Sequence, residues 1–101
     1  MATLTKKAML EAMEGQMKDD IRWSVSAFKQ GEMIEAVSDY RTASLLATFI
    51  ANDDLFVSYA KEVTAFYGIE YSVWYKGVSR AYMDSLDETI RKKNTEKEAD
   101  K

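Results

Sequence analysis

The chain contains no cysteine, no histidine and no proline, and only 4 of its 101 residues are glycine. Without cysteine it has neither a disulfide framework nor a thiolate nucleophile, and without histidine it has no Ser–His–Asp triad. Carboxylates are the only strong metal ligands that remain, so a conventional zinc site is not expected. None of the glycines falls in a phosphate-binding pattern. The sequence therefore predicts a protein that is not an enzyme and holds no cofactor and no metal.

Long hydrophobic runs are also missing from the sequence. No stretch approaches the roughly 20 apolar residues that a membrane-spanning helix needs. Glu11 and Glu14 interrupt the segment in which a secretory signal requires about 7–15 apolar residues. We therefore expect a soluble, cytoplasmic protein that does not bind a membrane.

What the sequence does contain is typical of a small globular protein. Hydrophobic residues make up 47% of the chain and charged residues 31%, with 14 basic against 17 acidic side chains. A single domain most often has about 100–150 residues, so one domain is expected. Because proline is absent and glycine is scarce, little interrupts regular structure, and long helices are the natural expectation.

Apolar residues recur every three or four positions over most of the chain, which is the spacing of one face of an α-helix. A first helix is predicted between Thr5 and Gly31. The Thr5 hydroxyl can cap free backbone N–H groups, and Gly31 tolerates the positive φ that is common at a helix end. The apolar stripe of this helix consists of Leu10, Met13, Met17, Ile21, Val25 and Phe28.

Two further helices are expected after the first. The second covers about residues 32–51 and is apolar on nearly two faces, so it is the best candidate for a central helix. The third begins after residues 52–54, where Asn or Asp can cap it, and ends at Gly68. A cluster of small residues in the second helix allows another helix to approach closely; these are Ala36, Ala43, Ser44 and Ala47.

The segment 69–76 is ambiguous because its β-branched and aromatic side chains are typical of a strand. A single strand has no partner in this chain, whereas a helix that begins near Ser72 continues the helical spacing, so a fourth helix is predicted. Beyond Lys93 almost every residue is polar and has nothing to bury, which predicts a disordered charged tail over 94–101. The stripe of the fourth helix is Trp74, Val78, Ala81, Tyr82, Leu86 and Ile90.

These segments predict an all-α fold, a compact four-helix domain over residues 1–93 with a long first helix and a frayed, polar C-terminal tail. Met9, Met13 and Met17 lie on consecutive turns of the first helix. A methionine row suits either an irregular core or an adaptable contact surface. Core packing within one chain is the favoured interpretation of the row. A homodimer through the first helix is also expected, because it buries the part of that helix that projects beyond a minimal bundle.

Aromatic residues are dense around the last two helices. Phe66, Trp74 and Tyr82 lie on the apolar stripes and are predicted to be core residues. Tyr71 and Tyr75 lie off that face and are followed by Lys76 and Arg80. Because tyrosine can bury area while its hydroxyl stays hydrated, we expect these last four residues to form a contact with a partner.

A line of carboxylates runs along the second helix. Glu32, Glu35 and Asp39 are separated by three and four residues, so they share one face. Such a line can receive a basic partner or coordinate Mg²⁺. We interpret it as a second, electrostatic partner-binding surface.

Residues 63–78 have the rhythm of a helix-turn-helix motif, with a short turn at Gly68. In that motif the second helix enters the major groove of DNA, and Lys76 and Arg80 would face the DNA. The pattern is weak, because Thr64 takes the place of the usual alanine and the domain is acidic rather than basic.

The function that the sequence favours is a small non-catalytic protein-interaction module, acting as an adaptor, regulator or inhibitor of a larger protein machine. The expected partner is another protein. The alternative function is a dimeric helix-turn-helix DNA-binding transcription regulator.

Overall fold

The computed structural model describes residues 5–99, with side chains as far as Lys93, and these residues form four α-helices and no β-strand. The helices are α1 (Lys6–Lys29), α2 (Met33–Phe49), α3 (Asp53–Phe66) and α4 (Tyr71–Ala99). The predicted all-α, four-helix fold is confirmed. The ambiguous segment 69–76 belongs to α4 from Tyr71 onward.

The residues predicted to begin and end the helices do so. The Thr5 hydroxyl accepts a hydrogen bond from the Ala8 amide at 3.1 Å, and the Asn52 side chain accepts one from the Leu55 amide at 3.1 Å. Each cap pairs one of the N–H groups that the first turn of a helix leaves free. Gly31 and Gly68 follow α1 and α3 with φ values of +80° and +71°, a conformation that favours glycine.

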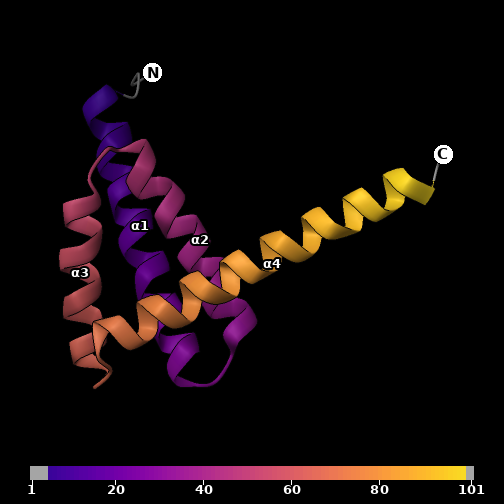
Figure 1. Cartoon of the computed structure of the whole chain (residues 1–101). Coiled ribbons are helices and arrows are strands. Elements are labelled where there is room, and N and C mark those ends of the chain that lie inside the picture. The colour runs from indigo at the N-terminus through magenta and orange to yellow at the C-terminus, as the bar shows by residue number, and fades with distance from the viewer. Residues whose placement is uncertain (1–4, 100–101) are drawn as a thin grey trace.

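Helices α1, α2 and α3 lie alongside one another, and α4 crosses them near one end and then projects away (Figure 1). The most extensive contact is between α1 and α2, and α2 also packs against α3 and α4. Helix α2 thus contacts all three other helices, but its predicted burial on nearly two faces is wrong, because Leu45 and Phe49 on the second face are exposed. Its buried face is built from small side chains, which let α1 approach closely; they are Ala36, Ala43 and Ala47.

Ser24 of α1 ties three helices together. Its hydroxyl donates to the Ala36 carbonyl of α2 at 2.6 Å, and it accepts from the Trp74 indole N–H of α4 at 3.1 Å. All three groups are buried, and a buried polar group without a partner costs about 1–3 kcal/mol. This pair of bonds therefore fixes where α4 sits on the α1–α2 pair.

Tyr40 is the centre of an aromatic cluster in the core. Its ring meets Trp74, Phe56 and Tyr82 edge-on, with ring centroids 5.9, 6.3 and 6.3 Å apart. Edge-to-face pairs of this kind add about 0.5–1.5 kcal/mol each beyond the area they bury. Burial, followed by the neighbouring Tyr75 hydroxyl, raises the pKa of Tyr40 to about 12. The rest of the core is aliphatic and includes Met17, Ile21, Val25, Ala60, Val63 and Val78.

The predicted core position of Phe66 is wrong, because 84% of this side chain is exposed. Helix α3 turns Thr64 to the core instead. The Thr64 hydroxyl donates to the Ala60 carbonyl at 2.9 Å, so its burial leaves no hydroxyl unpaired. The core position of Trp74 is confirmed, and Tyr82 is half-buried against the core.

Helix α4 has 29 residues and is longer than α1, which has 24. Its first turns lie close to α1, because a Cβ at Gly77 would stand 2.8 Å from Cε2 of Phe28. The rest projects, and the radius of gyration is 16.6 Å, against about 13 Å for a compact globule of this length. The backbone stays helical through Ala99, within the predicted tail 94–101, whose side chains and last two residues lie outside the described part of the chain.

Candidate protein-binding site

Tyr71 and Tyr75, predicted as contact residues, form the rim of the aromatic cluster. Their rings stack with centroids 5.6 Å apart and an interplanar angle of 19°. Tyr75 also meets Tyr40 edge-on, and Lys61 lies over the Tyr71 ring. Tyr71 is half-buried, and burial raises its pKa. Both side chains thus help to anchor the start of α4, and their role in partner binding stays a prediction.

Lys76 and Arg80 are exposed on α4 but do not share a face with the two tyrosines. At 3.6 residues per turn they lie about 100° and 140° around the helix axis from Tyr75. The predicted aromatic and basic residues are therefore neighbours in sequence that the helix separates in space.

The α3–turn–α4 succession expected for a helix-turn-helix is present, with residues 67–70 as the connection. Lys76 and Arg80 are exposed near the start of α4, but so are Glu70 and Asp84. The charges on this part of α4 are mixed and do not form a basic band. DNA binding by this pair of helices remains a prediction.

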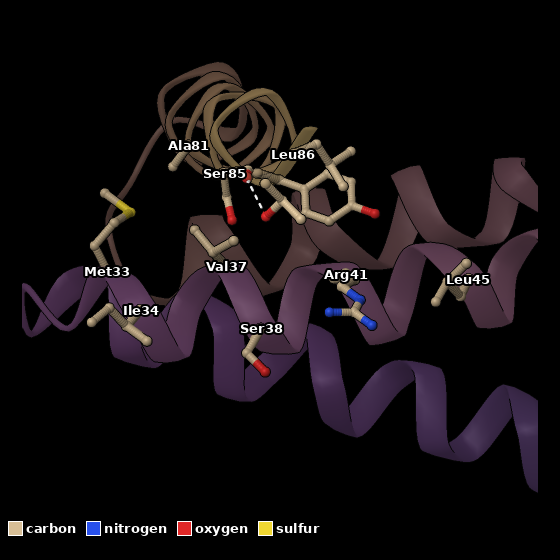
Figure 2. A pocket seen from close by; sticks show the side chains of 11 residues that line it. Met33, Ile34, Val37, Ser38, Arg41, Leu45, Ala81, Ser85 and Leu86 are labelled. Atoms are coloured by element: carbon tan, nitrogen blue, oxygen red, sulfur yellow. Dashed lines mark hydrogen bonds between the residues drawn. The ribbon is translucent and has the colours of Figure 1, made fainter. Parts of the chain in front are cut away.

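A groove of about 640 Å³ lies between α2 and α4, and we call it the α2–α4 groove. Figure 2 shows α4 crossing above α2, with Val37 rising from α2 toward Ser85 and Leu86 of α4. Among the residues that the structure describes, Arg41 is the only charged one on its lining. The remaining lining residues are Met33, Ile34, Ser38, Leu45, Ala81, Tyr82 and Thr89.

The walls of the α2–α4 groove are apolar and open to solvent. Ile34 is 88% exposed, Leu45 54% and Leu86 42%. The Thr89 hydroxyl donates to the Ser85 carbonyl at 3.0 Å within α4. This groove was not predicted from the sequence, although the second apolar face of α2 indicated an apolar surface there.

The apolar surface continues along the projecting half of α4. Met83 is 61% exposed and Ile90 55%, and with Leu86 they follow the three- and four-residue spacing of one helical face. We call these three residues the exposed stripe. The described part of the chain covers Met83 and Ile90 by less than half, and Leu86 stands where the stripe meets the α2–α4 groove.

Glu32, Glu35 and Asp39 are brought together, as predicted, on one side of α2. They line a second groove of about 560 Å³ between α1 and α2, which we call the acidic groove. Burial, followed by the charges of Asp20 and Glu35, raises the pKa of Asp39. Among the described residues no group of three or more acidic side chains is placed to hold a metal ion.

The methionine row of α1 is divided between core and surface. Met17 is fully buried, Met13 is half-buried, and Met9 is exposed. The core interpretation holds for Met17. Self-association through the N-terminal part of α1 stays a prediction.

Comparisons of the chain with protein-family models, with curated proteins and with solved structures found no match. Within the described residues, no helix has both the length and the apolar character to cross a membrane.

Proposed function

We propose that this protein is a non-catalytic interaction module that binds an amphipathic helix of another protein in the α2–α4 groove. The observation that carries the proposal is the run of exposed apolar side chains along both walls of the groove and onto the projecting half of α4. The contact we propose lies on a different surface from the aromatic and basic residues that the sequence favours.

The energetics support a binding role for this surface. Complete burial of a leucine, isoleucine or methionine side chain is worth about 1.5–3 kcal/mol. Much of this burial free energy is not gained in the free chain, because the side chains of Ile34, Leu86 and Ile90 remain exposed. A large contiguous apolar patch on a soluble protein usually marks an interaction surface. A partner that covers the groove recovers this free energy.

The shape of the groove favours a helical partner. It is bounded by two helices, and a helix that lies in such a groove contacts it through side chains spaced i, i+3, i+4 and i+7. Arg41 supplies the only charge on the groove lining. A complementary partner helix therefore carries an apolar stripe beside an acidic residue that reaches the Arg41 guanidinium. A chain of this size suits an adaptor, regulator or inhibitor of a larger machine.

The test is affinity capture from host lysate, read by mass spectrometry, with three baits. They are the wild-type chain, a double variant with Ile34→Asp and Leu86→Asp, and a control with Phe49→Asp and Phe66→Asp, which places the same two charges on exposed aromatics outside the α2–α4 groove. We expect one stoichiometric protein with the wild type and the control, and its loss with the double variant.

Two outcomes contradict the proposal. Equal recovery with the double variant excludes the α2–α4 groove as the contact. Recovery that disappears on nuclease treatment favours the alternative function, a dimeric helix-turn-helix DNA-binding regulator, and directs attention to Lys76 and Arg80.

A further inference from the structure

The exposed stripe of α4 faces away from the rest of the molecule. Met83 is 61% exposed and Ile90 55%, whereas Trp74, earlier on the same helix, is fully buried. Residues i and i+4 differ by about 40° around a helix axis, so Ile90 points about 160° away from Trp74. The helices that bury Trp74 therefore lie on the other side of α4 from Ile90. Figure 1 shows this part of α4 projecting away from α1, α2 and α3.

Charged residues lie along one edge of the exposed stripe in a definite order. Asp87 follows Met83 by four residues, which places it about 40° around α4 from Met83. Asp84 and Arg91 stand three residues before Asp87 and four after it, so they lie on the same side of the helix. All three charged residues are exposed. Alongside the stripe, this edge is therefore acidic first and basic after.

This surface is self-complementary when two α4 helices lie antiparallel. A two-fold axis level with residue 88 places Leu86 of each copy opposite Ile90 of the other, because both residues are two positions from the axis. Spacings of three and four residues are those of a coiled-coil seam. The same axis brings Arg91 of each copy level with the turn between Asp84 and Asp87 of the other. Opposite charges then meet at both ends of the contact, whereas a parallel pair would place like charges together.

We propose that the exposed stripe is a dimerisation surface, which a second copy of the chain covers with its own exposed stripe in antiparallel orientation when no partner is bound. The inference concerns a part of the surface in the proposed function, and it rests on that function in one respect: a bound partner displaces the second copy. The surface differs from the N-terminal part of α1, through which the sequence predicts a homodimer.

The small size of the contact predicts a weak dimer. The exposed stripe supplies three apolar side chains from each copy, against about 20–30 residues a side in a standard protein interface. We expect a dissociation constant on the order of 0.1 mM. At this affinity the chain is mainly a monomer at micromolar concentrations and mainly a dimer near about 1 mM. A partner that binds more tightly than this displaces the second copy.

The test is sedimentation equilibrium of the full chain from about 10 μM to about 1 mM, a range that brackets the expected dissociation constant. The wild type should pass from monomer to dimer. Ile90→Asp should weaken self-association by about tenfold or more, because a charge replaces an apolar side chain in the seam. Met9→Asp, which places the same charge on an exposed residue of α1, should leave it unchanged. Both residues are more than half exposed in the free chain, so both variants are expected to fold.

Charge reversal tests the antiparallel orientation. Arg91→Glu alone, and Asp84→Lys with Asp87→Lys, should each weaken self-association about fivefold, because like charges then meet at both ends of the contact. An equimolar mixture of the two variants should associate more tightly than either variant alone, because every contact in the mixed dimer is attractive again. A parallel dimer would behave differently, since reversing one charge in both copies only exchanges one like-charge pair for another.

Three results overturn the inference. These are a monomer at every concentration, an unchanged affinity of Ile90→Asp, and a mixture of the charge variants that associates no more tightly than each variant alone. A loss of dimer with Met9→Asp in place of Ile90→Asp assigns the contact to α1 and also overturns it. Capture of a partner by a chain that stays monomeric overturns this inference alone, whereas a dimer that captures no partner overturns the proposed function alone.

Discussion

The two halves of α4 have similar sequence patterns and opposite environments. In the first half, Trp74 and Val78 are fully buried against α1, α2 and α3. Beyond Tyr82, in the part we call the second half, Met83, Leu86 and Ile90 recur at the same helical spacing and remain exposed. Figure 1 shows the reason: α4 leaves the other helices partway along its length.

This difference shows that an apolar stripe on a helix indicates a surface that is stabilised by burial. The stripe does not indicate whether the same chain or a partner buries that surface. The first half of α4 is covered within the chain, because Ser24 holds the Trp74 indole and Gly77 lets Phe28 approach. The second half has no such neighbour among the described residues. A partner covers it in the function proposed above, and the contrast between the two halves can be tested by substitution.

The largest expected effect is that of Trp74→Ala. Removing a fully buried tryptophan leaves a cavity and an unpaired Ser24 hydroxyl, so the free energy of unfolding should fall by about 3–5 kcal/mol. Urea denaturation followed by circular dichroism measures this change. A loss below about 1 kcal/mol, the size of an average point mutation, shows that the first half of α4 is not packed as described.

Ser24→Ala should have the next largest effect. It removes the acceptor of the Trp74 indole N–H and the hydroxyl that bonds to the Ala36 carbonyl. Leaving a buried donor unpaired lowers the free energy of unfolding by about 1–3 kcal/mol, and the same denaturation experiment measures this loss. Ser85→Ala, at an exposed position in the second half of α4, is the matched control and should change stability by less than about 0.5 kcal/mol.

Asp20→Asn should stabilise the protein at neutral pH. Burial raises the pKa of Asp20 above its ordinary value of 3.8, so the folded chain holds this proton more tightly than the unfolded chain. By linkage, the Asp20 contribution to the free energy of unfolding falls as pH rises from 3.8 through the raised pKa. The variant should therefore exceed the wild type in thermal stability at pH 7, and the difference should disappear below pH 3.8.

An Asp20→Asn variant that is less stable than the wild type at pH 7 contradicts this account of Asp20. A gain in thermal stability at pH 7 that disappears at low pH supports it.

The smallest effect on stability is expected in the exposed stripe. Met83→Ala and Ile90→Ala should each change the free energy of unfolding by less than about 0.5 kcal/mol, because more than half of each residue is exposed in the free protein. The same variants should weaken capture of the partner. A loss of several kcal/mol in denaturation experiments on either variant indicates that the stripe is covered within the chain.

Much of the fold could be predicted from the sequence, because the signals are local. Thr5 and Asn52 cap helices, and Gly31 and Gly68 end them, through geometry that each residue prefers by itself. The small residues Ala36 and Ala43 also predicted that another helix approaches α2 closely, and in the structure that helix is α1.

The features that could not be predicted depend on tertiary packing. Thr64 is buried and Phe66 exposed because the rotation of α3 is set by its neighbours, and the Thr64 hydroxyl finds a backbone acceptor. Asp20 is buried, and no pattern in the sequence around it indicates this burial. The projection of α4 could not be predicted either. Leu86 continues the apolar stripe that Trp74 begins, so the sequence pattern does not indicate where α4 leaves the other helices.

The most direct test of the central claim is hydrogen exchange of the backbone amides, measured for the free protein and for its complex with the captured partner. The account predicts fast exchange in α4 beyond Tyr82 in the free protein, and partner-induced protection in residues 33–45 of α2 and 81–93 of α4. Protection confined to residues 71–80, with none in the α2–α4 groove, would contradict it.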